Sequence, residues 1–172
     1  MLRIYCKNTG TFKEFQEGST LLDMIPEFDF ERPYEIISAK VNNVSQGLKF
    51  RVFNNRDVEF LDYRTYAGRN VYCRSLCFLL CKAAQDLFPG CKVVIRRPIS
   101  KGYFCRLDKP GGESMHRDDI AAIRERMQQL VAADTPFRRH EVQATEAISL
   151  FRGLGMPDKV KLLETCGEVY VS

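Results

Sequence analysis

Three cysteines in residues 71–90, VYCRSLCFLLCKAAQDLFPG, have a spacing that could serve metal or thiol chemistry. Cys73, Cys77 and Cys81 recur every four residues, which places them on one face of a helix. At that spacing they climb about 12 Å, too far for all three to reach one ion, and a structural zinc site takes four ligands. Free cysteine otherwise behaves as a small buried apolar residue. We therefore predict the buried seam of a central helix and no metal site.

The remaining residues that could do chemistry offer little for catalysis. His116 and His140 come without an orienting partner or a second ligand at metal spacing, so we expect solvated structural roles for both. The chain has no GxxxxGK[ST] sequence, and PGGES at residues 110–114 lacks the lysine and the spacing of a phosphate-binding loop. The sequence therefore excludes a Walker-type ATP site within this chain.

Basic residues are interleaved with aromatic ones in two strand-like segments. They are Arg96, Arg97, Lys101 and Arg106 with Tyr103 and Phe104, and Arg138 and Arg139 beside Phe137. Side chains of these two kinds together hold phosphates and stack bases in nucleic-acid-binding proteins. The alternative is a solvated strand face with the aromatics turned inward, which period-two alternation produces without any ligand. The pattern alone favours this second interpretation.

Composition is typical of a globular protein. The 172 residues are 45% hydrophobic and 28% charged, and the net charge of +4 permits nucleic-acid binding without requiring it. No segment approaches the roughly eighteen apolar residues of a transmembrane helix, and MLRIYCKNTG lacks the features of a signal peptide. We expect a cytoplasmic protein with no membrane partner, whose seven cysteines are reduced.

The elements that must position these residues fall into two groups, and together they predict an α+β protein. Strands are expected at residues 2–5, 11–15, 36–41, 48–53 and 58–62, with one short helix that Ser19 or Thr20 caps and Pro26 stops. Strands and a helix in that order suggest a ubiquitin-like β-grasp. A polar stretch at residues 63–70 then precedes the cysteine helix, and we place the domain boundary there.

The second group alternates helices with strands. Strands are expected at residues 92–99, 103–108 and 137–142, and helices near residues 118–131, 144–152 and 158–164, before a final strand-like EVYV. Asp118 and Asp119 stand in the first turn of their helix, where carboxylates favour the helix dipole. Gly153 and Gly155 close the next one.

The order of these pieces resembles a known pair of domains. The first part resembles a TGS domain through EGSTLLDMI, IISAKVNN and NNRDVEFLD. The rest resembles the second N-terminal domain of threonyl-tRNA synthetase, which carries editing in bacterial enzymes. The matching segments are RSLCFLLCKAAQDLFPG, SKGYFCRLD, HRDDIAAIRERMQQLVAADTPFRRHEV and EAISLFRGLGMPDKVKLLE. The resemblance implies a TGS-like β-grasp at residues 1–64 and an α+β second domain at residues 65–172, truncated at its C-terminal end.

The chain departs from the synthetase at the positions that matter for editing. The HxxxH histidines of the family correspond here to Arg74 and Phe78, which can neither bind a metal nor shuttle a proton at neutral pH. The family's lysine before its final helix corresponds to Lys159, and its CRGPH-like segment would lie beyond Ser172. We therefore expect no catalytic residue and no metal ligand in this chain.

Uridine kinase-like proteins of some bacteria carry both domains ahead of a P-loop domain, and this arrangement fits the departures. The resemblance implies a regulatory or ligand-binding region of such a kinase, with ATP and magnesium expected only in the kinase domain that would follow. The degenerate cleft would bind a nucleotide, an RNA end or an amino acid through Arg74, Ser75, Tyr103 and Lys159, since arginine suits phosphate and carboxylate. The alternatives are an RNA-binding or aminoacyl-tRNA deacylase module, and a structural domain that holds a homo-oligomer together.

Overall fold

The computed structural model describes residues 1–99 and 102–171, and in it the chain forms two compact units, Met1–Leu130 and Val131–Ser172. Helices and strands occur in both units, and the largest sheet is mixed, so the predicted α+β class is confirmed. This division does not address the boundary proposed between residues 64 and 65, which stays a prediction. No helix among the described residues is long and apolar enough to cross a membrane.

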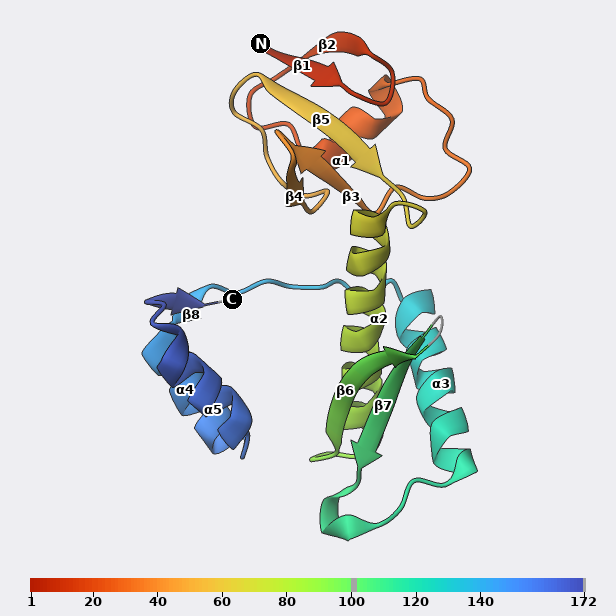
Figure 1. The fold of residues 1–172 in the computed structure, drawn as a ribbon, viewed down its shortest axis with the longest axis vertical. Helices are drawn as coiled ribbons and strands as arrows, with labels where there is room; N and C mark the ends of the chain where they lie inside the picture. The colour runs from red at the N-terminus through yellow and green to blue at the C-terminus, as the bar shows by residue number, and fades with distance from the viewer. Residues whose placement is uncertain (100–101, 172) are drawn as a thin grey trace. The chain divides into compact units, whose positions relative to one another are not determined.

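A five-stranded mixed sheet forms the N-terminal part of the first unit (Figure 1). Its strands are β1 (Leu2–Cys6), β2 (Thr11–Phe15), β3 (Ser38–Val41), β4 (Val44–Gln46) and β5 (Arg56–Leu61). The spatial order is β2-β1-β5-β3-β4, with β1 and β5 parallel and the other pairs antiparallel. The identification of this sheet specifically as a TGS β-grasp remains an interpretation.

The short helix α1 (Leu21–Met24) begins where the sequence predicts. Thr20 is its N-cap, and the Thr20 and Asp23 side chains accept each other's backbone N–H groups in a capping box. A 3₁₀ turn, η1 (Ile25–Glu27), follows because Pro26 cannot continue the helical hydrogen-bond ladder. Leu21, Met24 and Phe28 are buried with the inner faces of the strands in one hydrophobic core.

The strand expected at residues 48–53 is not present, and this prediction is wrong. The described backbone there forms an isolated bridge between Thr20 and Arg51 and further hydrogen bonds, such as that from the Leu21 N–H to the Phe50 carbonyl, instead of a strand. The β-strand falls earlier, at β4. Asn42 and Asn43 both have positive φ, so the chain reverses in two residues and pairs Val41 with Val44. Val52 is nevertheless fully buried, which accounts for the apolar pattern that suggested a strand.

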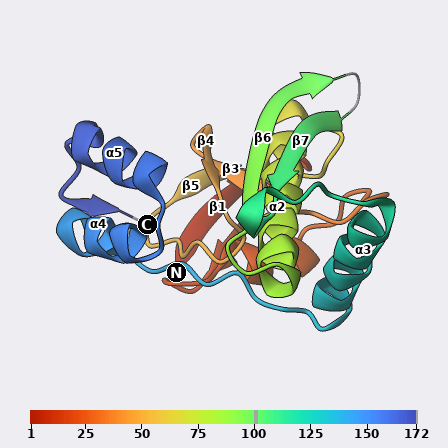
Figure 2. The same ribbon diagram turned by 90° about the horizontal axis from the view of Figure 1, so that it is seen from below.

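The rest of the first unit consists of two helices and a β-hairpin. These are α2 (Tyr66–Leu87), β6 (Lys92–Ile99), β7 (Gly102–Asp108), a 3₁₀ turn η2 (Pro110–Gly112) and α3 (Arg117–Ala132). Both views place the hairpin against α2 (Figure 1, Figure 2), and Ala83, Ala84, Cys91, Ile123 and Leu130 form the buried core that joins them. Asp86 of α2 pairs with Arg126 of α3 at 2.8 Å.

The second unit holds two short strands and two helices. They are β8 (Val142–Gln143), α4 (Ala144–Gly153), α5 (Pro157–Cys166) and β9 (Tyr170–Val171), with α4 and α5 lying side by side (Figure 1). The strand predicted at residues 137–142 is wrong except at its end, because residues 137–141 form no ladder and are exposed. Arg138, Arg139 and His140 therefore lie in irregular chain rather than on a strand face.

The cysteine helix is confirmed, but its cysteines are less buried than predicted. Cys73, Cys77 and Cys81 are each half-buried, and all seven cysteines of the chain are free thiols in the structure. The fully buried residues of α2 are instead Gly68, Ala83 and Ala84, so the three cysteines are not part of its fully buried set. Across residues 1–99 and 102–171, no three His, Cys, Asp or Glu side chains come together as metal ligands would.

Candidate nucleic-acid interface

The four residues proposed to line a degenerate editing cleft lie on three different elements. Arg74 and Ser75 are on α2, Tyr103 is on β7, and Lys159 is on α5 of the second unit. Arg74, Tyr103 and Lys159 are exposed, and the Ser75 hydroxyl donates to the Val71 carbonyl of its own helix at 3.0 Å. The structure thus gives the place of each of these residues, and their binding role stays a proposal.

The histidines also have defined places. The backbone N–H of His116 donates to a carboxylate oxygen of Asp119 at 2.8 Å, which closes the first turn of α3. Asp119 also pairs with Lys109 at 2.7 Å, and the Lys109 hydrogen bond is the main cause that lowers the pKa of Asp119. The ion pair with Lys109, the residue after β7, ties the end of that strand to the start of α3.

The strand β6 contains a bulge that the sequence analysis did not foresee. Ile95 pairs with Cys105 and Pro98 pairs with Tyr103, so two residues of β6, Arg96 and Arg97, stand opposite one residue of β7. That residue is Phe104. A bulge of this kind bends the strand and changes the direction of its side chains.

One face of the hairpin packs on the helices. Val93 and Leu107 are directly paired and lie against the core that α2 and α3 share. Cys105 lies on the same side, since its thiol is close enough to Cys77 of α2 to add to the rise in the pKa of Cys77, which burial causes first. Alternation along the strands therefore turns Val94, Arg106 and Phe104 to the opposite face.

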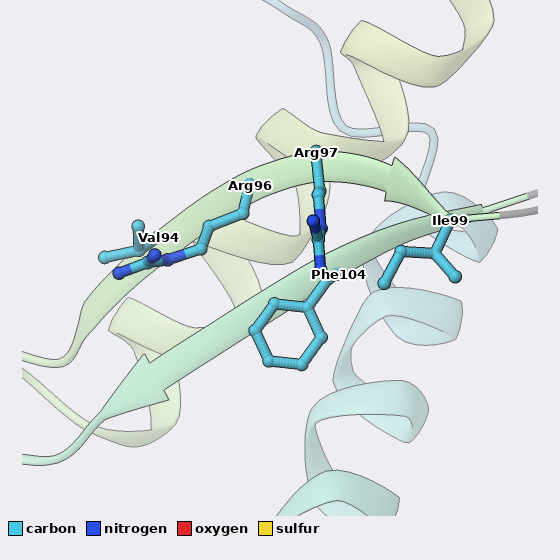
Figure 3. Close-up of a pocket in the computed structure, with 5 residues that line it drawn as sticks. All are labelled: Val94, Arg96, Arg97, Ile99 and Phe104. Carbon is cyan, nitrogen blue, oxygen red and sulfur yellow. The ribbon is translucent and has the colours of Figure 1, made fainter.

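This outer face bears a hollow of about 770 Å³, lined by Val94, Arg96, Arg97, Ile99 and Phe104 (Figure 3). Phe104 is 50% exposed and Ile99 51% exposed, values high for large apolar side chains. Both arginines are exposed, and neither forms an ion pair with a carboxylate among the described residues. We call these five residues the outer hairpin face.

The charge of the outer hairpin face is positive at its centre. Arg106, opposite Val94, pairs with Asp108 at 3.0 Å and so contributes little net charge. Arg96 and Arg97 have no such partner in the part of the chain that the structure describes, so their guanidinium groups are available to an anion, which they can bind through paired hydrogen bonds. An apolar aromatic surface beside two available cations is an arrangement that suits a nucleotide or a nucleic acid.

The sequence pattern favoured aromatics turned inward, and for Phe104 this interpretation is wrong. Phe104 lies with the arginines on the outer face, whereas Tyr103, its neighbour, takes the opposite side of β7. Lys101, grouped with these residues in the sequence analysis, lies outside the described residues. A signal for the bulge was present in the sequence, because a proline inside a strand marks an edge or a bulge, and Pro98 follows the two arginines.

Comparison with known proteins gives threonine–tRNA ligases among its relatives. The chain is 29% identical over 155 residues to the threonine–tRNA ligase of Natranaerobius thermophilus and 29% identical over 168 residues to that of Syntrophomonas wolfei. It is 26% identical over 154 residues to that of Parabacteroides distasonis. These alignments cover 90%, 98% and 90% of the chain but only 24%, 26% and 24% of the relatives. No protein-family model matches.

The chain therefore spans about a quarter of the length of the curated relatives it matches. The resemblance to a region of threonyl-tRNA synthetases is confirmed at this level. The reported relatives give no support to a uridine kinase-like parent, which stays a prediction.

Proposed function

We propose that this chain is an RNA-binding module related to a region of threonyl-tRNA synthetases, with tRNA as the class of ligand. The observation that carries the proposal is the outer hairpin face, where Arg96 and Arg97 stand opposite the exposed ring of Phe104. The relatives supply the second support. The chain resembles, along nearly its whole length, ligases that act on tRNA.

The proposal is for binding rather than hydrolysis. Arg74 and Phe78 occupy the two positions where the resemblance places the editing histidines, one helical turn apart on α2. A guanidinium stays protonated at neutral pH and a phenyl ring has no basic atom, so neither replaces a general base. Deacylation by this chain would need a group supplied from elsewhere.

A regulatory role within a uridine kinase-like parent is a finer proposal that rests on the resemblance alone. In that arrangement Arg74, Ser75, Tyr103 and Lys159 would bind a nucleotide or amino-acid effector, and ATP with magnesium would belong to the separate kinase domain. Homo-oligomerisation through this region, and a place in the cytoplasm, are further parts of the same proposal. The test of Arg74 is an Arg74→Ala variant in a calorimetric titration with anions. An affinity equal to that of the unaltered chain would show that Arg74 is not part of this site.

The test of RNA binding is the affinity of the chain for unacylated tRNA at several salt concentrations, measured by fluorescence anisotropy. We expect the double variant Arg96→Ala/Arg97→Ala to bind more weakly and to reduce the slope of log K against log salt by about two, because two phosphate contacts are lost. The matched control is Arg138→Ala/Arg139→Ala, which removes the same charge from irregular chain.

Equal losses in the two double variants would show that net charge, rather than the outer hairpin face, drives binding. No measurable binding of tRNA by the unaltered chain at low salt would overturn the proposed function itself.

A further inference from the structure

We propose that the outer hairpin face selects an unpaired nucleotide, with its base on Phe104 and its phosphate held by Arg96 and Arg97. This inference rests on the proposed function and names the part of the RNA that the site takes. It follows from how the bulge arranges one ring and two guanidinium groups.

The bulge is the first step. In a regular antiparallel ladder, one residue stands opposite one residue, so a single arginine would face Phe104. Here the pairs Ile95–Cys105 and Pro98–Tyr103 leave Arg96 and Arg97 together opposite Phe104. Two residues with cationic side chains therefore stand across the ladder from one residue with an aromatic ring, on strands whose backbones are about 5 Å apart.

The size and lining of the hollow form the second step. Its volume of about 770 Å³ lies within the range of small-molecule sites, roughly 300–1,000 Å³. Val94 and Ile99 flank the hollow with apolar surface, and Phe104 presents half of its area to solvent. A base needs such a flat apolar contact, while its phosphate needs the positive charge beside it.

The state of the nucleotide is the third step. In a duplex, both faces of every internal base are already stacked on neighbouring base pairs, so no face is available to Phe104. The phosphates of a duplex remain accessible to Arg96 and Arg97. The arginines therefore contribute affinity for any RNA, whereas Phe104 contributes only where a base is unstacked, at a single-stranded end, loop or bulge.

The test compares two RNA hairpins with the same stem, whose strands are joined by a non-nucleotide linker so that neither has an unpaired loop base, one blunt and one carrying a four-nucleotide single-stranded 3′ extension. We expect the unaltered chain to bind the extended hairpin roughly 5- to 150-fold more tightly, the range that stacking one base gives. Phe104→Ala should abolish this preference while retaining binding to the blunt hairpin, and Phe104→Tyr, which keeps a ring, should retain the preference. Phe53→Ala, which removes an exposed ring from the N-terminal part, is the matched control.

The outcomes separate the two claims. Equal affinity of the unaltered chain for both hairpins would overturn the inference and leave the proposed function standing. Failure to bind either hairpin would overturn the inference, and failure of the unaltered chain to bind tRNA as well would overturn the proposed function. Displacement of the extended RNA by a polyglutamate peptide at equal charge concentration would overturn the inference in favour of an acidic protein partner.

Discussion

The five-stranded sheet and the β6–β7 hairpin are built from similar strands, yet they use their apolar residues differently. The sheet buries thirteen hydrophobic residues in one core, including three phenylalanines, Phe15, Phe28 and Phe60. The hairpin buries five hydrophobic residues together with α2 and α3, and three of these are small, two alanines and a cysteine. Phe104 stays on the outer hairpin face.

The difference shows which aromatic residues stabilise the fold and which are available for binding. Phe28 is 1% exposed and lies with its ring centroid 5.7 Å from that of Phe15 and 6.1 Å from that of Phe60. Phe104 is half exposed and stands opposite two arginines. A large apolar side chain that the core does not use is a better candidate for a ligand contact than a buried one.

The largest expected effect is on stability, from the same substitution made in both regions. Phe28→Ala should lower the free energy of unfolding by about 3–5 kcal/mol, because it leaves a cavity among three packed rings. Phe104→Ala should lower it by less than about 0.5 kcal/mol, since its ring is half solvated. Urea denaturation followed by circular dichroism measures both, and similar losses would contradict the comparison.

A smaller effect is expected from glycine substitutions. A Cβ atom at Gly68, in the first turn of α2, would lie 1.9 Å from the backbone carbonyl oxygen of Asp62, which cannot move aside as a side chain would. Gly68→Ala should therefore cost about 1–3 kcal/mol of unfolding free energy. Gly102→Ala in the hairpin is the control, because a Cβ added there would meet no described atom within 4 Å. The thermal midpoint of unfolding of the Gly102→Ala variant should hardly change.

The smallest effect concerns Asp62, which follows β5 at the end of the sheet. One oxygen accepts from the Arg64 guanidinium at 2.7 Å and the other accepts from the Arg64 backbone N–H at 2.9 Å. The Arg64 side-chain hydrogen bond is the main cause that holds the pKa of Asp62 below its ordinary value, against the opposing effect of burial. Asp62→Asn should cost about 1 kcal/mol at pH 7, a modest value because Arg64 is half exposed.

The pH dependence of that loss has a definite sign. A carboxyl group whose pKa is lower in the folded state stabilises the fold fully above its unfolded pKa of about 3.9. That contribution disappears as the pH falls through the folded pKa. The stability difference between the unaltered chain and Asp62→Asn should therefore be constant from pH 7 to about pH 5 and shrink in more acidic solution. A difference that grows on acidification would contradict the ion pair, and Asp29→Asn, on an exposed residue, is the control.

Local structure was largely predictable from the sequence. Helix α1 begins after Thr20 and ends before Pro26, as expected, and the cysteine spacing predicted α2. Asp118 and Asp119 lie in the first turn of α3. The two wrong strands, at residues 48–53 and 137–142, share a cause. Alternating apolar residues indicate burial of one side of an extended chain, but a ladder also needs a neighbouring strand with free N–H and C=O groups.

The candidate site was predictable only as a set of residue types. Arginine and aromatic side chains near residues 96–106 were visible in the sequence, but the face that each side chain takes depends on register. One extra residue at Arg96–Arg97 changes the register, and this decides that two arginines instead of one stand opposite Phe104. Propensity and periodicity describe one strand at a time, whereas a bulge is a property of a pair.

The sequence by itself determined the α+β class, the helix boundaries marked by caps and prolines, and the resemblance to threonyl-tRNA synthetases, because each depends on residues close together in the chain. Only the tertiary structure decided that β1 lies parallel to β5, that the three cysteines of α2 are half-buried instead of buried, and that Phe104 shares the outer hairpin face with two arginines. Each of these features depends on contacts between elements. Local preferences favour the alternative arrangements equally, and packing and strand pairing select among them.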